Sequence, residues 1–205
     1  KSYGGALEVV MATTGEVPEY FGKESLIVGN DIHKIPVPNE GWIVSLDYPK
    51  SRDVAEPLIR KYLPDRYIKK WSQTDRILEL TNGSVIGFKS CDSGWEKFMG
   101  VARHWIWFDE EPAWEIYKEC IMRLVDYQGY MWGTMTPEHG MSSWSYYTIW
   151  EQRDEDPDID VFTAEIYDNK ANLPADEIVR LERLFQGEEG DAKLRGRFVE
   201  FAGLI

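Results

Sequence analysis

The sequence predicts an α/β protein built around a mostly parallel β-sheet. Segments 104–111 (HWIWFDEE) and 130–137 (YMWGTMTP) open with runs of mainly apolar residues that do not alternate with polar ones. Such runs are typical of strands that are covered on both faces. A helical segment from Ala113 to about Tyr127 separates them, and strands that alternate with helices form parallel sheets with right-handed crossovers.

The remaining elements follow from local periodicity and from turn residues. Segment 76–90 (RILELTNGSVIGFKS) has two alternating runs on either side of Asn82-Gly83, the strongest short signal for a β-hairpin. Ser51 is the expected N-cap of a helix that ends before Pro64. We expect further helices at 2–14, 51–62, 142–153, 174–186 and 189–197, and further strands at 25–28, 41–48 and 161–167.

Composition excludes several classes of protein. The 205 residues are 43% hydrophobic, which is enough for one ordinary domain with a core and a smaller appendage. No apolar stretch approaches the roughly 18 residues of a membrane span, so we expect no membrane partner. Cys91, Cys120 and three scattered histidines have no metal-site spacing, and a reducing, cytosolic setting fits best.

The formal net charge is −13, which argues against broad nucleic-acid binding but leaves room for a local basic face. Segment 50–76 is such a candidate, with eight Lys and Arg residues against four acidic residues. It is read either as a solvated helix face or as a contact for a polyanion.

Three adjacent carboxylates, Asp109, Glu110 and Glu111, follow the apolar run at 104–108. Ligands of open parallel sheets bind at the carboxyl ends of the strands. A hydrophobic strand that ends in Asp-Glu matches a nucleoside-triphosphatase site, where the Asp holds Mg²⁺ and the Glu polarises the attacking water. The alternative is an acidic turn that stabilises the next helix, with Pro112 in its first turn.

Two other segments strengthen the triphosphatase hypothesis. Thr134 and Thr136 stand at the tip of the next predicted strand, where hydroxyl groups can sense a γ-phosphate or hold the attacking water. Lys1-Ser2 directly precedes a predicted helix, as the last residues of a phosphate-binding loop do. Lys1 would then neutralise the phosphates of ATP, and the Ser2 hydroxyl would bind Mg²⁺.

In combination, these segments resemble the large terminase subunit of tailed bacteriophages, the motor ATPase that packages viral DNA. The resemblance covers most of the chain. It rests on Lys1-Ser2 with its helix, WIVSLDYPKSRDVAEPLIRKYLP (42–64), LTNGSVIGFKSCDSGWEKFMG (80–100), WIWFDEEPAWEIYKECIMRL (105–124) and GYMWGTMTPEHGMSSW (129–144). It implies a three-layer P-loop NTPase fold (RecA-like, ASCE) with helices on both faces of the sheet and a small helical linker subdomain.

The resemblance implies specific roles. Lys1 and Ser2 would end the Walker A loop, Asp109 would be the Walker B magnesium residue, and Glu110 the catalytic glutamate. Thr134, Thr136 and Pro137 match the motif that couples hydrolysis to motion. An arginine from a neighbouring subunit often completes such ring motors, and Arg103 is the first candidate, ahead of Arg123. For Arg103 and Arg123 alike, the alternative is an ordinary ion pair.

The resemblance also implies an organisation and partners. Residues 1–160 would be the ATPase core, cut at its start inside the Walker A loop, and 161–205 a linker subdomain. A nuclease domain would follow Ile205, so the chain itself should lack nuclease activity. The expected partners are double-stranded DNA, the portal protein, the small terminase subunit and other copies in a ring. The expected location is the host cytoplasm, with transient docking on the procapsid.

Two other functions stay open at this point. A helicase-like, DNA-dependent NTPase also has DExx followed by a Thr-containing strand, but it requires an Arg-rich motif on a second similar domain. A non-catalytic scaffold that binds the portal or the small terminase through an acidic face requires no hydrolysis.

Overall fold

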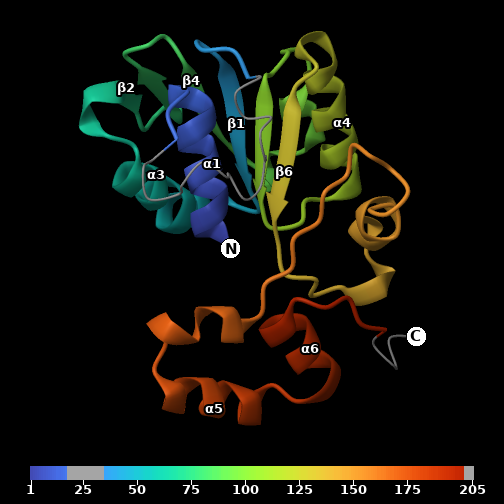
Figure 1. The fold of residues 1–205 in the computed structure, drawn as a ribbon. Coiled ribbons are helices and arrows are strands. Elements are labelled where there is room, and N and C mark those ends of the chain that lie inside the picture. The colour runs from blue at the N-terminus through green and yellow to red at the C-terminus, as the bar shows by residue number, and fades with distance from the viewer. Residues whose placement is uncertain (18–34, 201–205) are drawn as a thin grey trace. The chain divides into compact units, whose positions relative to one another are not determined.

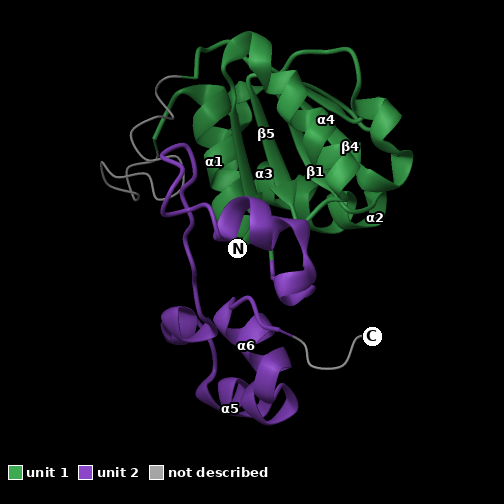
Figure 2. Cartoon of the chain, turned by 90° about the vertical axis from the view of Figure 1, so that its right-hand side faces the viewer, with its two compact units in different colours: residues 1–135 green, residues 136–205 purple. Residues whose placement is uncertain are grey.

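The computed structural model describes residues 1–17 and 35–200. The chain forms two compact units, unit 1 (Lys1–Met135) and unit 2 (Thr136–Ile205) (Figure 2). The strand predicted at 25–28 lies outside the described residues. The predicted boundary at 160/161 between an ATPase core and a linker subdomain stays a prediction.

Unit 1 contains a six-stranded sheet with the order β2-β3-β4-β1-β5-β6 (Figure 1). The strands are β1 (Glu40–Ser45), β2 (Ile68–Ser72), β3 (Ile77–Leu80), β4 (Val85–Ser90), β5 (Trp105–Asp109) and β6 (Tyr130–Thr134). β1 pairs in parallel with β4 and β5, and β5 pairs in parallel with β6. Only β3 runs antiparallel to its neighbours β2 and β4. The predicted mostly parallel sheet is therefore confirmed.

Helices pack on both faces of this sheet because β5 presents alternate side chains to each face. Trp105 and Trp107 belong to one buried cluster with residues of α1 (Ser2–Thr14) and α3 (Glu56–Tyr62). Ile106 and Phe108 belong to a second cluster with residues of α4 (Trp114–Leu124). This produces the three layers visible in Figure 1. The first four residues of β5 are all apolar because neither face of the strand meets water.

The helix predicted at 51–62 is real, but it begins earlier and is irregular. Its N-cap is Asp47, whose carboxylate accepts a 2.6 Å hydrogen bond from the backbone N–H of Lys50, so the prediction that Ser51 caps it was wrong. The chain passes from α2 (Tyr48–Lys50) through a π-helical turn (Ser51–Ala55) into α3. Pro57 has no N–H to donate within this helix, which favours such a departure from regular α geometry.

The Asn82-Gly83 hairpin between β3 and β4 is confirmed, with Gly83 at a φ of 92°. The sequence did not indicate β2, because the adjacent exposed lysines Lys69 and Lys70 break its alternation at a register shift.

In the basic segment 50–76, several cations form ion pairs, which supports its interpretation as a solvated surface. The pairs are Arg52–Asp53, Arg66–Glu16, Lys69–Glu79 and Arg76–Glu56.

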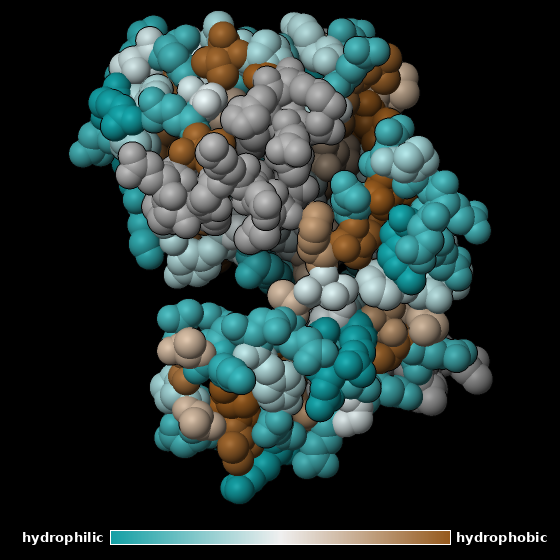
Figure 3. All heavy atoms as spheres, in the orientation of Figure 1, coloured by the Kyte–Doolittle hydropathy of each residue, from teal (hydrophilic) through white to brown (hydrophobic). Residues whose placement is uncertain are grey.

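Unit 2 is helical and irregular. It contains 3₁₀ turns at Gly140–Ser142 and Ile166–Asn172, a π-helical turn at Tyr146–Trp150, and helices α5 (Ala175–Leu184) and α6 (Gly187–Arg195). The two closing helices match their predictions, whereas the helix expected at 142–153 is shorter and ends in turns. Hydrophilic residues prevail over this unit on the face drawn in Figure 3.

The strand predicted at 161–167 was wrong. Residues 161–165 have no regular structure, and Phe162 is 65% exposed. Glu165 and Asp168 form a capping box, in which each side chain accepts a hydrogen bond from the other residue's backbone N–H. This local pairing starts a helical turn, and no neighbouring strand in the described part of unit 2 competes with it.

Among the described helices, none is long and apolar enough to cross a lipid bilayer.

The close approach of α1 to β5 depends on Gly5, which predicts a stability effect. A Cβ atom there would lie 2.3 Å from Cε2 of the buried Trp107. We expect Gly5→Ala to lower the free energy of unfolding by about 1–3 kcal/mol through overpacking, measured by denaturant titration. Gly4→Ala, at a half-buried position of the same helix, is the control and should be neutral or stabilising because Ala favours helix. Equal effects of the two substitutions would contradict this packing.

Candidate active site

A row of polar side chains crosses the carboxyl edge of the four parallel strands. Ser45 of β1 is the register partner of Ser90 on β4 and of Asp109 on β5, and Asp109 is the partner of Thr134 on β6. All four lie on the sheet face that packs against α1, because they continue the alternation of the residues buried under that helix. They are 1–7% exposed. A buried polar row at the end of an apolar sheet marks a site for a polar ligand.

The first turn of α1 meets this row. The Ser2 hydroxyl donates a 2.7 Å hydrogen bond to Oδ1 of Asp109, and Nζ of Lys1 contacts Oε1 of Glu110. α1 is brought there by apolar packing, since Ala6 and the apolar residues of the next turn lie in the same buried cluster as the tryptophans of β5. The predicted site residues Lys1, Ser2, Asp109 and Glu110 are therefore assembled in one place.

Thr134 belongs to the same cluster through two hydrogen bonds. Its Oγ1 accepts a 2.9 Å bond from the indole N–H of Trp107 and donates a 3.3 Å bond to Oδ1 of Asp109. Trp107 lies in a run that the sequence predicts as a buried strand, and periodicity holds no signal that would distinguish this indole from the other buried ones. Thr136 lies in unit 2, and its expected position near Asp109 stays a prediction.

The environment of Asp109 is suited to a divalent cation. Burial raises the pKa of this carboxyl group above its ordinary value, the Ser2 hydrogen bond lowers it, the adjacent Glu110 raises it, and Thr134 and Lys1 lower it. Protein groups therefore compensate only part of the free-energy cost of burying the charged carboxylate, and a bound cation would offset the remainder.

The kind of cation follows from the available ligands. Among the described residues, no group of three or more His, Cys, Asp or Glu side chains is arranged to hold a metal ion. An ion at Asp109 would therefore take few protein ligands, here a carboxylate and the Ser2 hydroxyl. Mg²⁺ fits this set, because it usually binds through one or two carboxylates and keeps water or phosphate oxygens as its other ligands.

Glu110 has an unusual backbone. Its φ is 84°, although it is not glycine, and its N–H donates a 3.1 Å hydrogen bond to the carbonyl oxygen of Thr134. Such conformations cost about 1–3 kcal/mol and concentrate at functional sites. The conformation turns the chain sharply after β5, so Asp109 remains in the buried row while Glu110 reaches Lys1.

The helix-capping interpretation of the three carboxylates was wrong. Helix α4 begins at Trp114 after the N-cap Ala113, and its first-turn acid is Glu115. Pro112 precedes the N-cap, so it does not occupy the first turn. Glu111 is half-buried, and one of its carboxylate oxygens has no hydrogen-bond partner among the described residues; no role follows from its position.

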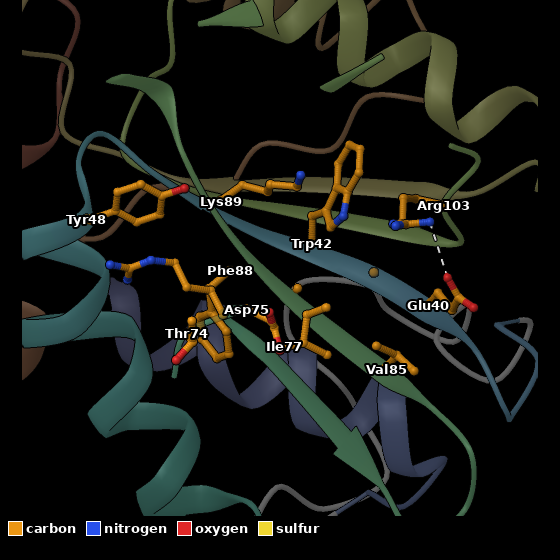
Figure 4. A pocket seen from close by; sticks show the side chains of 13 residues that line it. Glu40, Trp42, Tyr48, Thr74, Asp75, Ile77, Val85, Phe88, Lys89 and Arg103 are labelled. Atoms are coloured by element: carbon orange, nitrogen blue, oxygen red, sulfur yellow. Dashed lines mark hydrogen bonds and ion pairs between the residues drawn. The ribbon is translucent and has the colours of Figure 1, made fainter. Parts of the chain in front are cut away.

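The structure does not bring Arg103 to this edge of its own sheet. Arg103 precedes the amino end of β5, whereas Asp109 ends the strand. Its guanidinium group pairs with Glu40 at 3.2 Å and stacks 4.5 Å from the ring centre of Trp42 (Figure 4). Burial lowers its pKa, and it lines a cavity of about 260 Å³ together with Lys89 and Tyr48. Arg123 pairs with Glu119 at 2.9 Å.

A second cavity adjoins the first turn of α1 and was not anticipated from the sequence. It has a volume of about 440 Å³. One wall consists of Lys1, Ser2 and Tyr3, and the opposite wall comes from the π-helical turn and α3. The cavity thus offers space beside the two residues expected to bind phosphate.

Comparisons with known proteins agree with the resemblance. Residues 43–205 match the family model described as "Terminase large subunit, T4likevirus-type, N-terminal". Over 59 residues the chain is 39% identical to the terminase large subunit of Salmonella phage P22, an alignment that covers 29% of this chain and 12% of that protein.

Solved structures of the large terminase from a thermophilic bacteriophage share the fold. One crystal form aligns with a TM-score of 0.70 at 14% identity and covers 95% of this chain and 53% of the other. The ADP complex of that protein aligns at 0.65 with 18% identity, covering 95% and 53%. Its ATP-γ-S complex aligns at 0.66 with 17% identity, covering 95% and 52%. The predicted RecA-like fold is confirmed, and the chain spans about half the length of these terminases.

The raised pKa of Asp109 predicts how stability depends on pH. A carboxyl group that binds its proton more tightly in the folded state destabilises the fold when it is ionised, so this cost is present at neutral pH and disappears below the ordinary pKa of about 3.9. Without divalent cations, we expect Asp109→Asn to raise the free energy of unfolding at pH 7, with little difference near pH 3.

Chemical denaturation across this pH range measures the effect. Asp126→Asn, at an exposed position, is the control and should change stability by less than about 0.5 kcal/mol. A stability difference for Asp109→Asn that does not vary with pH would contradict the assigned burial cost.

Proposed function

The chain belongs to the family of N-terminal domains of T4-like virus large terminase subunits, and from this premise we propose that it is the ATP-hydrolysing motor domain that drives double-stranded DNA into a procapsid. One observation carries the proposal for this chain. Lys1 and Ser2, at the start of α1, meet Glu110 and Asp109, at the end of β5. This is the arrangement of charge and hydroxyl groups that a metal-bound triphosphate requires.

Each of these side chains has a distinct role in binding. Lys1 neutralises the β- and γ-phosphates, and Ser2 and Asp109 supply the oxygen ligands of Mg²⁺. When bound, Mg²⁺ offsets the charge that develops on the phosphate oxygens. The cavity of about 440 Å³ beside Lys1, Ser2 and Tyr3 leaves room for part of the nucleotide. The terminase of the thermophilic bacteriophage, solved with ADP and with ATP-γ-S, supports a nucleotide as the ligand class.

Glu110 acts as the general base. Its carboxylate accepts a proton from a water molecule as the water oxygen attacks the γ-phosphorus. The bond between the γ-phosphorus and the bridging oxygen breaks, and ADP leaves with that oxygen. Lys1 contacts Glu110 in the structure, so the phosphates of ATP compete for this lysine and release the carboxylate to act on water. The tight backbone turn at Glu110 keeps its carboxylate separate from Asp109.

Thr134 and Thr136 connect hydrolysis to motion. Thr134 hydrogen-bonds the Asp109 carboxylate, and the chain passes from unit 1 to unit 2 directly after Met135. The residues after Thr134 thus lead along the chain from the proposed γ-phosphate site into unit 2. In the same proposal, residues 1–160 are the motor core, 161–205 the linker subdomain, and a nuclease domain follows.

Assembly and location complete the proposal. Several copies form a ring on the portal protein with the small terminase subunit, in the host cytoplasm and transiently on the procapsid. Arg103 reaches the site of an adjacent copy, with Arg123 as the second candidate. Arg103 must then exchange its Glu40 partner for a phosphate oxygen.

Substitution of the general base tests the proposal. In the full-length protein with DNA present, Glu110→Gln should lower the ATPase rate by about 10²-fold or more while ATP binding, measured by calorimetry, persists. Glu111→Gln removes the adjacent carboxylate and is the control, with a rate within a few-fold of the unaltered protein. Unchanged turnover in Glu110→Gln would favour a non-catalytic scaffold over a motor.

A further inference from the structure

We propose that Trp107 is a positioning residue for the metal-binding carboxylate. Its indole N–H orients the Thr134 hydroxyl, which in turn holds Oδ1 of Asp109, so that Oδ2 would be available to bind the cation. The inference rests on the proposed function, because it assumes that Asp109 binds Mg²⁺. It assigns a site role to a side chain that is fully buried beneath α1.

The direction of each hydrogen bond follows from the chemistry of the groups. An indole nitrogen only donates, and a hydroxyl group has one hydrogen and can also accept. Since Thr134 Oγ1 accepts from Trp107 at 2.9 Å, its single hydrogen is available for Oδ1 of Asp109 at 3.3 Å. Without the indole, only the longer bond to Asp109 would orient the hydroxyl group.

The two oxygens of the Asp109 carboxylate are consequently different. The Ser2 hydroxyl also donates to Oδ1, at 2.7 Å, so two hydroxyl groups converge on one oxygen. Among the described residues, no hydrogen bond ends on Oδ2. The carboxylate is thereby held by one oxygen, and the other keeps its lone pairs for a ligand.

Trp107 also determines how closely Ser2 approaches. Its indole lies against Gly5, where an added Cβ would be 2.3 Å from the indole Cε2 and Nε1 atoms. The first turn of α1 therefore rests on the same ring that orients Thr134. Trp107 therefore contacts the helix that carries Ser2 and is linked through Thr134 to Asp109, the two proposed metal ligands.

Other buried tryptophans on this sheet have different partners, which provides matched controls. The indole N–H of Trp105 donates to Oδ1 of Asn39 at 2.8 Å, and that of Trp132 donates to the carbonyl oxygen of Gly5 at 3.4 Å. Neither bond leads to Asp109. Trp105→Phe removes a comparably buried donor, two positions earlier on the same strand and face, without touching the Trp107–Thr134–Asp109 relay.

A double-mutant cycle in the full-length protein tests the relay, with Mn²⁺ binding in the presence of ADP as the readout. Trp107→Phe and Thr134→Val should each weaken Mn²⁺ binding about tenfold, as loss of a group that orients a metal ligand does. The double variant should bind no more weakly than either single variant, because both remove the same relay. Thr134→Ser keeps the hydroxyl and should retain affinity, and Trp105→Phe should match the unaltered protein.

A measurement made without metal tests this inference independently of the proposed function. Thr134→Val removes the acceptor of the Trp107 indole N–H, so NMR should show faster hydrogen exchange of this proton and no change at Trp105. If Asp109→Ala binds Mn²⁺ as well as the unaltered protein does, the proposed metal site fails while the exchange result still tests the relay. Additive losses in the cycle, or equal losses in Trp107→Phe and Trp105→Phe, would overturn the role of Trp107.

Discussion

The contact between the start of α1 and the end of β5 is the constraint on which the site depends. The hydrogen bond from Ser2 to Asp109 joins residues 107 positions apart in sequence. It forms because Gly5 lets the helix approach the indole of Trp107. Shape complementarity in the core therefore sets the spacing of the polar groups at the end of the sheet, and loss of this packing would separate the proposed phosphate-binding and metal-binding residues.

The burial of β5 on both faces explains how a site at the edge of the core is kept rigid. Trp107 anchors one face beneath α1, and Ile106 and Phe108 anchor the other beneath α4. The strand ends in Asp109 where apolar packing stops, so the carboxylate is fixed at the margin of the core. Burial raises the pKa of this group, and the resulting cost can be offset by a cation. Burial of the charged Asp109 carboxylate thus lowers the stability of the cation-free protein and raises the affinity of this site for a cation.

Glu110 and Arg103 show how differently two candidate catalytic groups are held. Glu110 directly follows the buried strand in a strained conformation, within reach of Lys1. Arg103 lies at the opposite end of β5 and is paired with Glu40. A role for Arg103 thus requires another copy of the chain and a change of partner, whereas Glu110 is already in the site. This difference in placement makes the carboxylate pair, Asp109 with Glu110, the stronger basis for the proposed chemistry.

The sequence by itself determined the parallel α/β class, the hairpin at Asn82-Gly83 and the carboxylates at the tip of β5, because periodicity, turn chemistry and strand ends are local properties. It did not reveal β2, and it wrongly predicted a strand at 161–167, because an edge strand forms only where a neighbour offers hydrogen bonds. Only the tertiary structure decided the relay through Trp107. Which polar atom the indole N–H of Trp107 meets depends on how segments that are distant in sequence pack together, and no local sequence pattern encodes that packing.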